Sequence, residues 1–238
     1  MAKIMISEKK YNYGNLLYIQ MALSELLKGA NCLVNYKIDK NRNNLIIECK
    51  DQYADIMQVE LADKIAEVIA IKYKYDFLVE NVKVAGLNSI EKEILFASLI
   101  AADLEDDKRY AFDRLKGYRQ TAIDGFYNFK LNLLKKKWQE VITYIPTCFL
   151  SAQLRDFISF LIENKQRKVY IDGGNVYDNH YRRLKRTALL GGEKVKIIRE
   201  VLLSNCGKVE LSGSIPADDE YYLREFYNDK IIFLHGND

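Results

Sequence analysis

The pattern of hydrophobic and polar positions predicts a small sheet with helices over the first third of the chain. Residues 3–7 are expected to form a short strand, and residues 12–28 carry apolar side chains near helical spacing. Residues 33–38 and 45–49 flank a polar, Asn-rich turn, which predicts a β-hairpin. Residues 53–75 keep an apolar face without an internal breaker, which predicts a long helix.

Helical spacing dominates the middle of the chain. A helix is predicted over residues 89–102, and the acidic patch at 103–107 is expected to open a second one, because carboxylates suit a helix N-terminus. Helices are also predicted over residues 126–144 and 151–164, with Pro146 ending the first of them. Large aromatic residues at helical spacing are expected to form core here: Phe126, Tyr127, Phe129, Trp138, Tyr144, Phe149, Phe157 and Phe160.

Short strands alternate with helices in the last third. Residues 169–177 contain Gly173-Gly174 between Asp and Asn, a strong signal for a two-residue hairpin turn. Strand, helix and strand following one another favour a parallel βαβ unit. The further elements predicted are a helix at 193–204, a strand at 208–211, a helix at 218–227 and a strand at 231–234.

These elements together predict an α+β fold. The expected organisation is an N-terminal subdomain of sheet and helices at 1–87, a helical region at 88–165, and a C-terminal region at 166–238. The last region is expected to hold a β-hairpin and a βαβ-like unit packed on the helices. At 238 residues the chain is long enough to bury a full core.

The four cysteines lie far apart, and no pair has the spacing of a zinc or redox site. The first ten residues lack the apolar run of a secretory signal. The simplest interpretation is four reduced, mostly buried thiols in a cytoplasmic protein. No stretch approaches the roughly 18 apolar residues of a membrane span, so none is predicted.

Charge is unevenly distributed along the chain, although its formal sum is only +3. Residues 114–199 carry 18 Lys and Arg against 7 Asp and Glu, a net charge of +11, while the flanking parts are both negative. A basic block of this size indicates an anionic partner, which could be nucleic acid or an acidic protein.

Three clusters make up most of this basic block. Arginine and aromatic side chains together can hold phosphates and stack bases, and the third cluster is interleaved with Tyr177 and Tyr181. The alternative is that each cluster is a separate solvated face whose Lys stems cover apolar surface. The clusters are Lys135, Lys136 and Lys137; Lys165, Arg167 and Lys168; and Arg182, Arg183, Lys185 and Arg186.

No catalytic constellation emerges from the sequence. His180 and His235 lack metal-ligand spacing, and the acidic patch lacks the spacing of an EF-hand, so it is interpreted as a solvated helix start. Gly191-Gly192 before a predicted helix could bind an anion or serve as a flexible joint. We therefore predict no catalytic residue, no metal ligand and no cofactor. For an enzyme, the first residues to inspect would be Asp124, Asp172 and His180.

Three stretches resemble the YtxC family of sporulation proteins. Residues 124–131, Asp-Gly-Phe-Tyr-Asn-Phe-Lys-Leu, are similar to the Gly-Phe-x-x-Phe-Arg/Lys-Leu element that opens a helix in that family. Residues 154–161 resemble the following helix, which leads into a strand such as 168–172. The ending, from Glu200 to Phe233, resembles the family's C-terminal helix, strand, helix and strand. The likeness covers roughly residues 88–234.

This resemblance implies a cytoplasmic protein of endospore-forming bacteria that is linked to sporulation. The family brings no catalytic residues to carry over. Together with the missing active-site constellation, it predicts a non-enzymatic protein that acts through interaction surfaces on an unidentified protein partner. Nucleic-acid binding through the basic block is the alternative, and an enzyme of unknown class is the third hypothesis.

Overall fold

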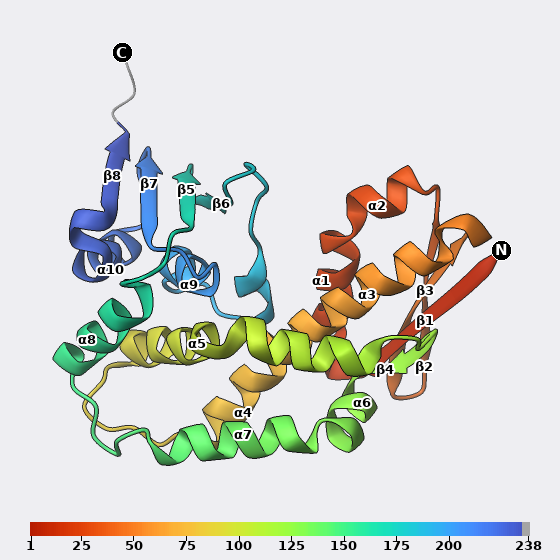
Figure 1. The fold of residues 1–238 in the computed structure, drawn as a ribbon, viewed down its shortest axis with the longest axis horizontal. Helices are drawn as coiled ribbons and strands as arrows, with labels where there is room; N and C mark the ends of the chain where they lie inside the picture. Colours follow the sequence, from red (N-terminus) through yellow and green to blue (C-terminus); the bar gives the residue numbers. More distant parts are fainter. Residues whose placement is uncertain (235–238) are drawn as a thin grey trace. The chain divides into compact units, whose positions relative to one another are not determined.

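The computed structural model describes residues 1–234 and has a mixed α+β fold, which confirms the predicted fold class (Figure 1). The chain divides into two units. Residues 1–74 and 105–141 form the N-terminal unit, while 75–104 and the described residues from 142 onward form the C-terminal unit. The residues of the expected helical region are therefore shared between the two units.

The N-terminal unit contains a four-stranded sheet in the order β2-β3-β1-β4. Its strands are β1 (Ala2–Lys9), β2 (Leu33–Asp39), β3 (Arg42–Cys49) and β4 (Gln120–Ala122). β2 and β3 form the predicted hairpin, and β3 pairs antiparallel with β1. The short strand β4 was not predicted, and it pairs parallel with β1.

Helices cover this sheet from both neighbouring and distant parts of the sequence. α1 packs against β1, β3 and α3, and α6 packs against β1. This packing buries the alternate residues Ile4, Ile6 and Glu8 of β1. The helical elements are α1 (Tyr13–Ala22), α2 (Ser24–Gly29), α3 (Ala54–Val68), α6 (Ile123–Lys130), α7 (Asn132–Thr143), and the 3₁₀ turns η1 (Lys10–Asn12) and η2 (Asp51–Tyr53).

Several helices differ from the predicted ones. The helix predicted over residues 12–28 is two helices, α1 and α2, separated by Leu23. α3 continues through a π-helical turn, η3 (Ile69–Tyr73), into α4 (Lys74–Asn81). α5 (Ser89–Leu115) runs unbroken through the acidic patch, so the prediction that a second helix begins there was wrong. The helix predicted over residues 126–144 is two helices, α6 and α7, which meet at Leu131.

The C-terminal unit contains a second four-stranded sheet in the order β6-β5-β7-β8 (Figure 1). β5 and β6 form the predicted hairpin, and Gly173 and Gly174 adopt φ values of 52° and 77°, which side-chain-bearing residues rarely tolerate. β5, β7 and β8 are parallel, as the βαβ prediction requires. The strands are β5 (Lys168–Asp172), β6 (Asn175–Tyr177), β7 (Lys208–Ser212) and β8 (Ile231–Leu234).

Three helices pack around this second sheet. α10 (Ala217–Tyr227) links the parallel strands β7 and β8, so it is a crossover helix. α9 (Lys196–Leu203) lies between the hairpin β5–β6 and β7 in the sequence. α10 also packs against α8 (Ser151–Ile162), α9 and β8. The unit also contains two short 3₁₀ turns, η4 (Arg186–Leu189) and η5 (Asn228–Lys230), most of α4 and the first part of α5.

The burial of the aromatic residues corrects one prediction about the core. Trp138 and Phe126 are buried as expected. Phe129, Tyr144 and Phe160 are strongly exposed, so they do not belong to the core. Helical spacing alone did not distinguish the inward side of these helices from the outward side. The expectation of mostly buried thiols is also incomplete, since Cys148 is exposed.

Candidate anion-binding site

Two of the three predicted basic clusters meet in the C-terminal unit. They line a hollow of about 400 Å³ at the beginning of β5, which we call the basic hollow. Arg167 and Lys168 come from the second cluster, and Arg182 and Arg186 come from the third. His180 and Asp178 also line the basic hollow. The hairpin β5–β6 makes this possible, because the chain after β6 returns toward the start of β5.

The other members of these two clusters lie outside the lining of the basic hollow. Arg183 is exposed and forms an isolated β-bridge with Tyr177. Lys165 and Lys185 are half-buried. The sequence clusters therefore split, and one part of each contributes to the basic hollow.

Asp178 shapes the loop that carries Arg182. Its Oδ1 accepts hydrogen bonds from the backbone N–H groups of His180, at 2.8 Å, and Arg182, at 3.0 Å. Its Oδ2 accepts a further bond from Arg182 Nε at 2.9 Å. Burial opposes the charge of Asp178, but these hydrogen bonds outweigh it and hold the pKa of Asp178 below its usual value. The carboxylate thus stays ionised and fixes a tight turn.

Other groups of the chain hold cations of the basic hollow in place, and Lys and Arg still outnumber the acidic residues that line it. Lys168 Nζ lies 2.7 Å from Glu210 Oε1, and this hydrogen bond raises the pKa of Lys168. Arg186 Nη1 donates to the carbonyl of Leu203 at 2.7 Å. The Arg182 side chain is 74% exposed although it pairs with Asp178. Asp178 is the one acidic residue among those lining the basic hollow, against four Lys and Arg.

A pair of stacked tyrosines lies next to these cations. The rings of Tyr170, on β5, and Tyr181 are 4.7 Å apart at an interplanar angle of 23°. The ammonium group of Lys168 lies 4.7 Å from the centre of the Tyr170 ring. Tyr181 is 69% exposed, and it stands between His180 and Arg182 in the sequence. An exposed aromatic ring therefore adjoins the basic hollow.

The first basic cluster belongs to the N-terminal unit, and none of its lysines lines the basic hollow. Lys135 Nζ donates to the carbonyl of Asn128 at 2.9 Å. Lys137 Nζ lies 2.7 Å from Asp107 Oδ1. Lys136 is exposed. This cluster is therefore partly engaged in contacts within its own unit.

The acidic patch is not a helix start, because α5 runs through it, and one of its members, Asp107, is not solvated. Its side chain is fully buried within α5, where Lys74 Nζ lies 2.8 Å from its Oδ2. The indole Nε1 of Trp138 donates to the same oxygen at 2.8 Å. A buried carboxylate needs such partners, because an unpaired charge in the interior is costly.

The three residues named for inspection in an enzyme lie at separate places. His180 lines the basic hollow, and Asp172 is exposed at the hairpin turn. Asp124 belongs to a buried polar cluster of the N-terminal unit. The second histidine, His235, lies outside the described residues.

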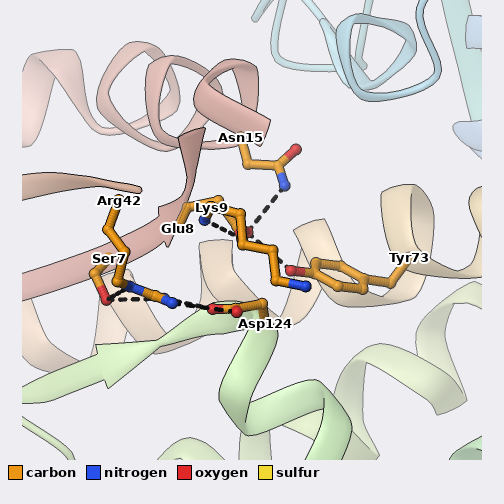
Figure 2. Close-up of polar contacts among 7 residues, drawn as sticks. All are labelled: Ser7, Glu8, Lys9, Asn15, Arg42, Tyr73 and Asp124. Atoms are coloured by element: carbon orange, nitrogen blue, oxygen red, sulfur yellow. Dashed lines mark hydrogen bonds and ion pairs between the residues drawn. The ribbon is translucent and has the colours of Figure 1, made fainter. Parts of the chain in front are cut away.

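Glu8 is the most buried carboxylate of that polar cluster (Figure 2). Its Oε2 accepts hydrogen bonds from Asn15 Nδ2, at 3.1 Å, and from the Tyr73 hydroxyl, at 2.9 Å. Its Oε1 accepts from the backbone N–H of Lys9 at 2.9 Å. Burial raises the pKa of Glu8, and the three hydrogen bonds oppose that effect.

Asp124 lies beside Glu8 in a different environment (Figure 2). Arg42 donates to both of its carboxylate oxygens, with Nη1 at 3.2 Å from Oδ2. Arg42 also donates to the hydroxyl of Ser7. Burial opposes ionisation of Asp124, but the contacts with Arg42 outweigh it and lower the pKa of Asp124.

Two carboxyl groups whose pKa values move in opposite directions are a pattern found in acid–base catalysis. Here both oxygens of Glu8 are occupied by donors of the chain, and the side chain is fully buried. Glu8 thus joins β1 to α1 and to the π-helical turn at Tyr73. We interpret the cluster as structural. The alternation of Ile4, Ile6 and Glu8 in the sequence was the signal that could have revealed it.

Gly191-Gly192 does not form an open anion site. The carbonyls of both glycines accept hydrogen bonds from Arg199 Nη2, at 3.1 and 3.0 Å. The N-terminus of α9 is occupied by the carboxylate of Asp219, whose Oδ1 accepts from the backbone N–H of Ile198 at 2.8 Å. The chain's own carboxylate therefore takes the place that an anion would occupy.

Among residues 1–234, no group of three or more His, Cys, Asp or Glu side chains could hold a metal ion. Within the same range, no helix combines the length and apolar character needed to cross a membrane. Comparison with protein-family models, curated proteins and solved structures finds no match to this chain.

Proposed function

We propose that this chain is a non-enzymatic, cytoplasmic binding protein that holds a phosphate-bearing partner in its basic hollow. The observation that supports this is the convergence of Arg167, Lys168, Arg182 and Arg186 around one hollow of about 400 Å³. Arginine binds phosphate through paired N–H donors, and lysine binds it as a compact charge.

The physical basis of binding is electrostatic. The four cations of the basic hollow outnumber the two carboxylates that contact them, Asp178 and Glu210, so the basic hollow attracts anions. These two carboxylates hold Arg182 and Lys168 in place. Positioned cations lose little side-chain entropy when a ligand arrives. A partner with several phosphates would release counterions on binding, so affinity should fall steeply as salt rises.

The test is the affinity of the full chain for inorganic polyphosphate at a series of salt concentrations. Arg167→Glu should weaken binding and make the plot of log K against log salt shallower by about one or more, because a phosphate contact is lost. Lys136→Glu is the matched control. It makes the same charge change at an exposed position of the N-terminal unit, and it should leave affinity within about twofold.

Two results would contradict the proposal. One is that the wild-type chain does not bind polyphosphate even at low salt. The other is that Lys136→Glu weakens binding as much as Arg167→Glu does, because the basic hollow would then not be the binding site.

The biological setting that we propose is endospore formation. It is supported by the resemblance of residues 88–234 to the YtxC family, and it agrees with a role in binding. Deletion of the gene in an endospore-forming bacterium that encodes this chain should lower the yield or the heat resistance of spores. Normal yield and normal resistance would remove this part of the proposal.

A further inference from the structure

We infer that the phosphate-bearing partner is a single-stranded nucleic acid, one base of which stacks on Tyr181 while its phosphate lies in the basic hollow. This inference rests on the proposed function and adds the class of ligand. It is carried by an exposed aromatic ring placed beside the cations on the same loop.

The ring of Tyr181 stacks on Tyr170 and leaves most of its surface exposed to a ligand. Tyr170 stacks against it at 4.7 Å, while 69% of Tyr181 remains exposed. Exposure of an aromatic ring to water is unfavourable in free energy. A ring that is exposed, and held in place by a second ring, is a common stacking platform for an unpaired base. In a duplex, both faces of each base are covered by neighbouring pairs. A stacking platform therefore selects an unpaired strand.

The loop holds this ring in a defined position. Tyr181 has a φ of 56°, in the left-handed region that non-glycine residues seldom adopt. Its N–H donates to the carbonyl of Asp178 at 3.0 Å, and the N–H of Asp178 donates to the carbonyl of Arg182 at 3.0 Å. The strained backbone is thus secured by hydrogen bonds on both sides of the ring.

Sequence neighbours of Tyr181 supply the phosphate contacts. His180 and Arg182 flank it directly, and both line the basic hollow. Lys168 lies over the ring of Tyr170, which stacks on Tyr181, and Lys168 also lines the basic hollow. A base on Tyr181 would therefore have its own backbone phosphate within reach of these cations. A peptide of glutamates alone offers charge but no ring that could stack on Tyr181.

The experiment compares probes and variants in the full chain. The probes are a short oligothymidylate carrying one 2-aminopurine, the corresponding DNA duplex, inorganic polyphosphate and polyglutamate. The variants are Tyr181→Leu, which removes the ring, and Tyr181→Phe, which keeps it. Thermal unfolding of each variant is measured first, so that a folding defect is recognised. The fluorescence of 2-aminopurine reports stacking directly and needs no variant.

We expect the oligothymidylate to bind more tightly than the duplex or polyglutamate, and 2-aminopurine fluorescence to be quenched on binding. Tyr181→Leu should weaken oligothymidylate binding by roughly tenfold and leave polyphosphate binding unchanged, and Tyr181→Phe should retain wild-type affinity.

Failure of this inference can be told apart from failure of the proposed function. If no anion binds, both are wrong. If polyphosphate binds but Tyr181→Leu has no effect on the oligothymidylate and 2-aminopurine is not quenched, only this inference fails. Preference for the duplex or for polyglutamate would also overturn it.

Discussion

At the scale of single residues, neighbouring carboxylates in the N-terminal unit are governed by different physical effects. For Glu8, burial dominates and raises the pKa. For Asp124, the hydrogen bonds and charge of Arg42 dominate and lower it. The difference arises because the donors to Glu8 are neutral, whereas Arg42 carries a full charge.

The raised pKa of Glu8 predicts a specific dependence of stability on pH. The folded protein holds the Glu8 proton more tightly than the unfolded chain, so its contribution to stability is present below the usual Glu pKa. It is lost as pH rises through the raised value, by about 1.4 kcal/mol for each pH unit of displacement. In Glu8→Gln this loss should be absent.

Urea unfolding of wild type and Glu8→Gln at a series of pH values measures this effect. The stability of wild type minus that of the variant should fall as pH rises above the usual Glu pKa. A difference that stays constant or rises over that range would show that burial does not dominate at Glu8.

At the scale of elements, the sequence predicted strands and helices well where local signals were strong. Gly173 and Gly174 specified the β5–β6 hairpin, because their positive φ angles suit the turn. β4 was missed because it is three residues long and its partner β1 is more than a hundred residues away. The acidic patch misled the helix prediction because carboxylates suit a helix N-terminus, whereas here they lie inside α5, which continues to Leu115. One of them, Asp107, takes its partners, Lys74 and Trp138, from distant parts of the chain.

The candidate site could likewise be predicted only in part from the sequence. The basic clusters and their aromatic neighbours could be recognised in the sequence, because their members are close together along the chain. Their convergence was not, because it depends on the direction in which the chain leaves β6. The role of Asp178 in setting the turn, and the stack of Tyr181 on Tyr170, likewise required coordinates.

Asp219 provides a prediction at the level of one helix. Its buried carboxylate caps the N-terminus of α9 from the first turn of α10. Asp219→Ala should lower the free energy of unfolding by about 1–2 kcal/mol, because the N–H of Ile198 loses its acceptor. Asp218→Ala, at the exposed neighbouring position, should change it by less than about 0.5 kcal/mol.

Chemical denaturation followed by circular dichroism compares these two variants with wild type. Equal effects of Asp219→Ala and Asp218→Ala would contradict the capping role and would assign both to the acidic first turn of α10.

At the scale of the whole molecule, the basic block of the sequence is divided between the two units. The basic block at 114–199 has a net charge of +11, yet Lys135–Lys137 belong to the N-terminal unit and Arg182–Arg186 to the C-terminal unit. Net charge of the full chain is only +3, so non-specific attraction of polyanions should be modest. Binding therefore depends on the local surplus in the basic hollow.

The most direct test of the central claim is a titration of the ¹⁵N-labelled full chain with a short oligothymidylate, followed by the backbone amide signals. The account predicts that signals of residues 167–170 and 178–186 shift, and that the shifts diminish when salt is added. It would be contradicted if no signal shifted at low salt, or if the shifts were confined to residues 132–143 around Lys135–Lys137.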